Sequence, residues 1–294
     1  MTMNESSDAV ITTNNSLLRI TKYRVEQEIA IKLNDIPVNS TQVKTDYTLS
    51  HSEHEPLLYF VHVDDYISKI SPDSHQPLLD VVKEIDRIKS NVALWIHPST
   101  GKPVSIMNHQ QIITEWQSYK EEFLKKNEFI RAEEVKQHIN NFISAFDDQI
   151  HSHEQLVSNL DTQLFFTTYF DHLLVRSQNF ESDVLMDFHS QLFEKVVTPL
   201  TVTQKIVQES PESIVVRKTA KPAGFIDVGE IERQYNQKYK PSIDYKFSAY
   251  SMEYDSQIEF NTAGKYLEYA DIRMRERVES NVELDISCRI RRKN

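Results

Sequence analysis

Residues 266–293 read YLEYADIRMRERVESNVELDISCRIRRK, and their pattern predicts two paired strands with a defined register. Apolar and charged residues alternate on both sides of residues 279–281, as in strands with one buried face. A two-residue loop would bring Val278 opposite Glu283 and mix the two faces, so the pattern favours a three-residue loop at 279–281. That loop predicts apolar pairs Val278–Val282, Met274–Ile286 and Ile272–Cys288, and charged pairs Arg277–Glu283 and Arg275–Asp285.

The N-terminal third shows the same alternation. Residues 17–33, 43–49 and 57–67 are predicted strands, and Asn34-Asp35-Ile36-Pro37 breaks the first from the second. Because residues 57–67 carry apolar side chains on both faces, we expect that strand to be central in its sheet. A four-turn helix with an apolar stripe over 78–88 follows, and then a hairpin with its turn at 99–102.

The middle of the chain predicts helices. Residues 109–190 contain neither glycine nor proline and show apolar stripes at helical spacing. Strands return over 196–207 and 214–218, Asp227 is a predicted N-cap of a helix over 228–238, and a meander covers 245–292. Segregated strands and helices predict an α+β fold, with antiparallel sheet from the N- and C-terminal thirds packed on the helical middle.

The domain prediction follows from this order of elements. Residues 1–15 are a predicted flexible polar tail and residues 16–294 a single α+β domain. Within the domain the lobes are 16–108 (β-rich), 109–190 (helical) and 191–294 (β-meander). The pattern leaves open whether the two β regions form one curved sheet or two.

Composition excludes several classes of protein. The 294 residues carry 33 Lys and Arg against 44 Asp and Glu, a net charge of −11, with one cysteine and four glycines. One cysteine excludes an intramolecular disulfide framework, and the scattered glycines form no nucleotide-binding or nucleophile-elbow motif. The polar N-terminus lacks a signal-peptide pattern and no window is apolar enough to span a membrane, so the sequence predicts a cytoplasmic protein.

Candidate metal or proton-transfer residues lie in the helical middle. If residues 135–157 form one helix, Asp147, His151 and Glu154 share a face at i, i+4 and i+7 and could hold a divalent cation. The alternative is a solvated face with local charge pairing. The same two interpretations apply to the loop residues His51 and His54 and to the pairs Asp64-Asp65 and Asp147-Asp148.

Three further features have competing interpretations. Cys288 falls on the apolar face of the last strand, which predicts a small buried side chain and no nucleophile. The arginine-rich C-terminal strands could bind single-stranded nucleic acid, but the many Glu and Asp on the same meander oppose this. The aromatic segment 164–174 is predicted to be core, with the floor of an apolar ligand cavity as the alternative.

The functional prediction is a non-catalytic protein-binding or assembly protein, such as an inhibitor or immunity protein or a component of a larger complex. Recognition would use an acidic, tyrosine-rich surface or a sheet edge, with another protein as partner and no cofactor or membrane. One alternative is a carrier or sensor of an apolar ligand held between sheet and helices. Another is a metal-assisted hydrolase that uses scattered His and carboxylates. Enzyme activity and homo-oligomerisation are left open.

Overall fold

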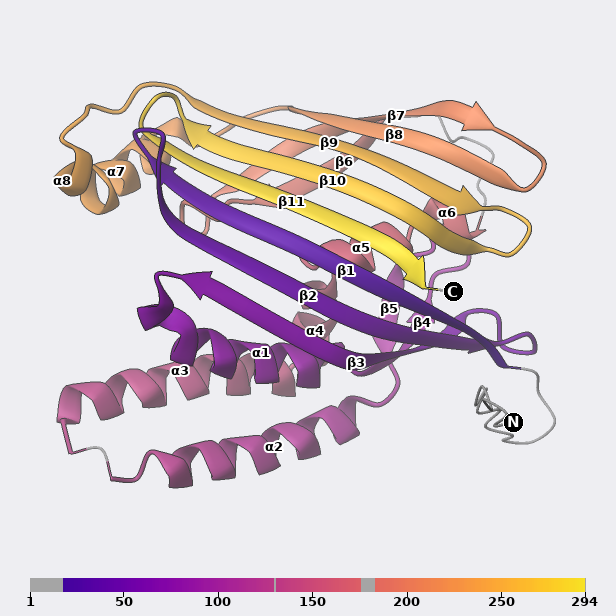
Figure 1. Cartoon of the computed structure of the whole chain (residues 1–294), viewed down its shortest axis with the longest axis horizontal. Helices are drawn as coiled ribbons and strands as arrows, with labels where there is room; N and C mark the ends of the chain where they lie inside the picture. The colour runs from indigo at the N-terminus through magenta and orange to yellow at the C-terminus, as the bar shows by residue number, and fades with distance from the viewer. Residues whose placement is uncertain (1–17, 130, 176–182, 294) are drawn as a thin grey trace, which may run out of the picture.

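The computed structural model describes residues 18–129, 131–175 and 183–293; the predicted tail, residues 1–15, lies outside them. Within these ranges eleven strands form one antiparallel sheet in the order β5-β4-β3-β2-β1-β11-β10-β9-β8-β7-β6 (Figure 1). The strands are β1 Leu18–Leu33, β2 Ile36–Ser52, β3 Leu58–Ser71, β4 Val92–Ile96, β5 Pro103–Ile106, β6 Val184–His189, β7 Val197–Glu209, β8 Ser213–Pro222, β9 Tyr250–Asn261, β10 Tyr266–Val278 and β11 Val282–Lys293.

The helices lie between the two groups of strands in sequence, and α1–α6 cover one face of the sheet (Figure 1). We call this face the inner face and the opposite one the outer face. The helices are the 3-10 turn η1 Asp73–His75, α1 Gln76–Ser90, α2 His109–Lys126, α3 Glu133–His151, α4 His153–Leu160, α5 Leu164–Tyr169, α6 His172–Val175, α7 Val228–Lys238 and α8 Lys240–Ile243. The predicted α+β class is confirmed.

The two β regions join in one sheet because the first strand pairs with the last. β1 and β11 are antiparallel neighbours from Lys22↔Lys293 to Leu33↔Val282. The predicted register of the final hairpin is also confirmed, since Val278 faces Val282 and Arg275 faces Asp285. Burial of one face selects this register, because a slip by one residue would turn every apolar side chain of the strand outwards.

The aromatic segment over residues 164–174 packs as core beneath the sheet. Phe165, Phe166, Tyr169 and Phe170 are buried. The ring of Phe165 stacks on Tyr47 of β2 with centroids 4.2 Å apart and planes within 5° of parallel. Such contacts add to the burial of apolar surface. These rings therefore pack against the inner face, and the prediction that this segment is core is confirmed.

Three local predictions were wrong. The strand at residues 57–67 is not central: β3 pairs with β4 only over Leu58–Val61, and Phe60 on its outer face is 45% exposed. The helical middle ends earlier than residue 190, because residues 184–189 form β6, which pairs with β7. One helix over 135–157 is instead two, α3 and α4, because the Ser152 side chain accepts a hydrogen bond from Gln155 N and caps a new helix.

Other local predictions were confirmed. The helix α7 covers residues 228–238, and the Asp227 carboxylate accepts a hydrogen bond from Glu230 N at 3.0 Å. The turn between β4 and β5 contains Gly101 at φ +70°, within the predicted 99–102 turn. A carboxylate at an N-cap satisfies a backbone N–H that the helix leaves unpaired, and this local effect does not depend on tertiary contacts.

Replacing Gly101 by alanine is expected to destabilise the protein by about 2 kcal/mol or more. Its φ of +70° is strained for other residues, and a Cβ there would lie 2.2 Å from the Asp171 carbonyl oxygen. The free energy of unfolding in urea measures the effect. The matched control is Gly229→Ala in α7, where the nearest atom to a Cβ is Asp227 Oδ1 at 3.6 Å. Equal stability of the two variants would contradict the prediction.

Candidate functional site

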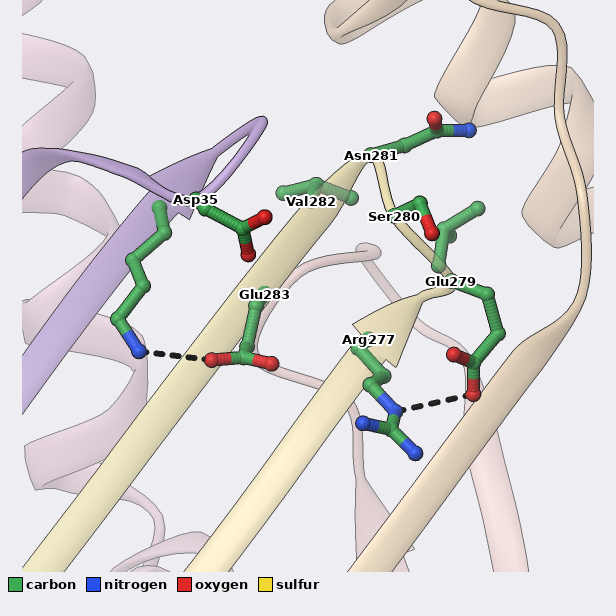
Figure 2. Close-up of a pocket in the computed structure, with 9 residues that line it drawn as sticks. Asp35, Arg277, Glu279, Ser280, Asn281, Val282 and Glu283 are labelled. Atoms are coloured by element: carbon green, nitrogen blue, oxygen red, sulfur yellow. Dashed lines mark hydrogen bonds and ion pairs between the residues drawn. The ribbon is translucent and has the colours of Figure 1, made fainter.

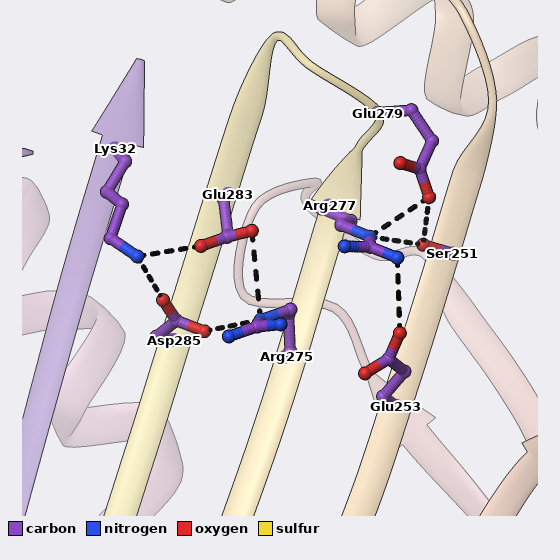
Figure 3. Close-up of polar contacts among 8 residues, drawn as sticks. All are labelled: Lys32, Ser251, Glu253, Arg275, Arg277, Glu279, Glu283 and Asp285. Atoms are coloured by element: carbon purple, nitrogen blue, oxygen red, sulfur yellow. Dashed lines mark hydrogen bonds and ion pairs between the residues drawn. The ribbon is translucent and has the colours of Figure 1, made fainter. Parts of the chain in front are cut away.

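An ion-pair network covers one end of the outer face, across β1, β11, β10 and β9 (Figure 3). Lys32 Nζ contacts Glu283 Oε1 at 2.8 Å and Asp285 Oδ2 at 2.6 Å, and Arg275 Nε donates to Asp285 Oδ1 at 2.7 Å. Burial raises the pKa of Asp285, but hydrogen bonds from Lys32 and Arg275 outweigh it and bring the pKa to about 2. The carboxylate is thus ionised at neutral pH.

The predicted charged pairs are only partly formed as ion pairs. Arg275 binds Asp285 as expected, whereas Arg277, although opposite Glu283 in register, turns to Glu279 at 3.0 Å and Glu253 at 3.2 Å. Glu283 is occupied by Lys32 of β1, a strand that the hairpin pattern alone does not place. Cations and carboxylates of this network therefore hold one another in place across neighbouring strands, with one carboxylate in excess.

A shallow polar depression lies where the β1–β2 and β10–β11 turns meet (Figure 2). Asn34 N donates to Asn281 O at 2.9 Å and ties the two turns together. Asp35, Glu279 and Glu283 supply carboxylates, but Lys32 and Arg277 already bind the last two. Within the described ranges no group of three or more His, Cys, Asp or Glu is arranged to hold a metal ion.

The other end of the outer face has an excess of cations. Across β1 and β11, Lys22 lies directly opposite Lys293 and Arg24 directly opposite Arg291. Like charges in directly opposed positions destabilise a sheet. We define the outer basic block as three successive rows of residues: Thr48, Lys22 and Lys293; Asp46, Arg24, Arg291 and Tyr269; Lys44, Glu26, Arg289 and Asp271. It contains six cations and three carboxylates, so its formal charge is 6 − 3 = +3.

Two carboxylates hold part of this block together. Asp46 accepts two hydrogen bonds from the Arg24 guanidinium, both at 2.8 Å, and a third from Lys293 Nζ at 2.8 Å. The hydrogen bonds from Arg24 hold the pKa of Asp46 well below its ordinary range. Glu26 pairs with Arg291. The block is thus partly compensated from within and retains a surplus of positive charge.

A buried carboxylate lies on the inner face of β10. Glu276 is 1% exposed and accepts hydrogen bonds from Ser190 Oγ, from Gln191 N at 2.9 Å and from Tyr250 Oη at 3.1 Å. It also accepts a weaker one from Leu192 N at 3.3 Å. Burial raises its pKa, and the hydrogen bonds only partly offset that effect. Glu276 therefore fastens the loop between β6 and β7 to the sheet.

A buried charged pair joins β8 to the segment between α5 and α6. Lys218 is 7% exposed, and its ammonium contacts the Asp171 carboxylate. Ser256 and Gln204 flank Lys218 in register on the neighbouring strands and are also buried. Ser256 Oγ and Asp171 Oδ1 are buried without a hydrogen-bond partner in the described structure. This polar row anchors the helices to the sheet.

The sequence pattern contained a signal for two of these buried charged residues, Glu276 and Lys218. Glu276 falls between Met274 and Val278 on the apolar side of the predicted register, and Lys218 alternates with Val216 and Ala220. A charged residue at a core position indicates a buried, paired group. Sequence reasoning missed Glu276 because it counted that residue among the charges of the meander, and it assigned no role to Lys218 at the end of the predicted strand over 214–218.

The three predicted metal residues do not share one face: Asp147 and His151 are neighbours on α3, with His151 Nδ1 3.9 Å from Asp147 Oδ1, but Glu154 is not on that helix. Asp147 in α3 accepts hydrogen bonds from Trp116 Nε1 at 2.6 Å and Lys120 Nζ at 2.5 Å, so it joins α3 to α2. His151 Nδ1 is 2.8 Å from the Asp147 backbone oxygen. Glu154 belongs to α4, beyond the break at Ser152. The i, i+4, i+7 face thus required a continuous helix that the chain does not form.

The remaining candidate residues lie in the following surroundings. The His51 ring stacks on Tyr59 with centroids 4.8 Å apart, and burial lowers its pKa. His54 is exposed in the β2–β3 loop. Asp64 accepts a hydrogen bond from Thr48 Oγ1 at 2.6 Å. Cys288 is buried as predicted, and burial raises the pKa of its thiol to about 12, so the thiol is protonated at neutral pH.

Comparisons with known proteins give little further information. No family model matches the chain, and no curated protein does. Five chains of solved structures match. One comes from a structure titled "Lipid-protein interactions in lipovitellin", with 10% sequence identity and a TM-score of 0.42. The match covers 94% of this chain and 25% of that chain, so this protein spans about a quarter of its length. No helix in the described ranges is long and apolar enough to cross a membrane.

Proposed function

We propose that this chain is a non-catalytic protein-binding or assembly protein that docks its partner on the outer face of the sheet. The observation that carries the proposal is the asymmetry of the sheet. Helices α1–α6 cover the inner face, while none of the described helices lies over the outer face of β1 and β9–β11, which presents ion-paired side chains (Figures 1 and 3). A surface whose side chains are held in place loses little conformational entropy on binding.

The type of surface differs from the sequence prediction. Six of the thirteen tyrosines are buried, and Tyr245 alone is among the large exposed apolar side chains at 54%. Nearly half of the tyrosines therefore belong to the core, and only Tyr245 is largely exposed, so the proposal does not rest on a tyrosine-rich surface. In the proposal, charged side chains on long strands recognise the partner instead.

The two edges of the sheet differ in how far they could pair with a strand of a partner. At β5 the edge is covered, because Ile106 N donates to His153 Nε2 of α4 at 3.1 Å. At the other end β6, a strand of six residues, pairs with β7 alone among the described strands. A short edge strand offers few backbone hydrogen bonds to a partner, so the outer face is the stronger candidate.

Cross-linking of the native complex tests the proposal. Protein purified gently from its source is compared by native mass spectrometry with the recombinant chain, and complexes are then treated with a lysine-reactive cross-linker. We expect a second polypeptide cross-linked to outer-face lysines such as Lys22 and Lys44. Lys83, Lys125 and Lys136 on the helices are the internal controls. Cross-links confined to the helices, or a bare monomer in both samples, would contradict the proposal.

A further inference from the structure

The outer basic block contrasts with the rest of the molecule in charge. The chain as a whole carries −11, so with the block at +3 the remaining residues carry −11 − 3 = −14. At the other end of the same strands, the network of Figure 3 has three cations and four carboxylates. Positive charge is therefore concentrated at one end of the outer face, where strands from the two ends of the chain meet.

Three cations of the block have no carboxylate of their own. In the described ranges Lys22, Lys44 and Arg289 form no ion pair within 4.0 Å, whereas Arg24, Arg291 and Lys293 do. Lys22 and Arg289 are exposed. Lys22 also faces Lys293 directly, and such a pairing of like charges costs stability. A bound anion would offset this repulsion, which makes the block complementary to an acidic ligand.

The surroundings limit the size of that ligand. The block spans four strands and three rows, about 14 Å by 13 Å at ordinary strand spacings. Carboxylates border it at Asp65 on β3, Glu28 on β1 and Glu259 on β9. A long polyanion such as a nucleic acid, or an anionic membrane surface, would have to approach these carboxylates and the negative remainder of the chain. A short segment would not.

We propose that the outer basic block binds a short, extended, carboxylate-rich segment of a partner protein. The proposal rests on the protein-binding function proposed above and adds the position of the contact and the chemistry of the partner. Alternate side chains of an extended segment recur about every 6.8 Å, which is also the separation of successive same-face rows on β1 and β11. Its carboxylates would thus meet Lys22, Arg24 or Arg291, and Arg289 in turn.

A peptide of eight glutamates labelled with fluorescein is the probe, and fluorescence anisotropy measures its dissociation constant. Lys22→Gln/Arg289→Gln removes two unpaired cations of the block. The matched control, Lys205→Gln/Arg217→Gln, removes two directly opposed cations of the same face outside the block. We expect about tenfold weaker binding for the first variant, less than about twofold for the control, and weaker binding at higher salt. The block variant should melt no lower than wild type.

Four results would overturn the inference. The first is equal binding by the two variants. The second is no binding of octaglutamate by wild type at low salt. The third is block-dependent binding of a single-stranded oligothymidylate or of phosphatidylserine vesicles that exceeds binding of octaglutamate. If the natural partner cross-links to the outer face but is unaffected by Lys22→Gln/Arg289→Gln, this inference fails and the proposed function stands.

Discussion

Replacing Lys218 by methionine is expected to destabilise the protein by about 3–5 kcal/mol, because it leaves the Asp171 carboxylate buried without its counter-charge. The side chains of Lys218 and Asp171 are 9% and 15% exposed, so water replaces little of the lost interaction. Asp171 also lies where α5 meets α6 against Gly101, so its displacement would loosen the helix layer. Urea denaturation followed by circular dichroism measures the loss.

Removing both charges should cost less than removing one. In Lys218→Met/Asp171→Leu no buried charge is left unpaired, so the double variant is expected to be more stable than Lys218→Met alone. Lys205→Met, an exposed lysine of the adjacent strand β7, is the control and should change stability by less than about 0.5 kcal/mol. A Lys218→Met variant as stable as that control would show that the pair does not hold the helices to the sheet.

Replacing Glu276 by leucine is expected to destabilise the protein by about 3 kcal/mol, because it deprives Ser190 Oγ, Gln191 N and Tyr250 Oη of a buried acceptor. The effect should be local as well as global. The loop between β6 and β7, with its buried residues Leu192 and Phe193, should exchange amide hydrogens faster than in the wild type. Unchanged exchange in this loop would contradict the assigned role.

The charge of Glu276 also predicts a pH dependence. Burial raises its pKa in the folded protein above the unfolded value, so its contribution to stability is present at low pH and is lost as pH rises through the folded pKa. Glu276→Gln should remove that loss from a series of unfolding measurements between acid and neutral pH. The pKa of Asp285 is about 2 in the folded protein, below its ordinary value. Its contribution to stability therefore has the opposite pH dependence and disappears as pH falls towards that value.

Alternation of apolar and charged residues was sufficient for much of the fold. It predicted the β10–β11 register, because one buried face penalises any slip. The N-cap residue Asp227 predicted the helix that follows it, because an N-cap acts within one turn. The alternation did not reveal that Ser152 caps a new helix, so the condition that residues 135–157 form one helix is not met. It also failed at residues 184–189, whose strand depends on pairing with β7.

The candidate site was accessible to sequence reasoning only in part. The hairpin register already placed Glu276 on the apolar face, so a buried carboxylate could have been inferred from residues 272–278 alone. The hydrogen-bond partners of Glu276 could not be inferred in this way, because Ser190 and Tyr250 come from other parts of the chain. The metal interpretation of Asp147 likewise required knowledge of Trp116 and Lys120, which occupy its two oxygens.

The sequence by itself determined most of the strands other than β6, the buried side of those strands and the alignment of the final hairpin, because these depend on local periodicity and on the hydrophobic effect. The tertiary structure alone decided that β1 pairs with β11 and makes one sheet of two β regions. Backbone N–H and C=O groups at a strand edge are chemically alike, so local pattern does not select the neighbour. That single pairing places Lys22 opposite Lys293 and creates the outer basic block.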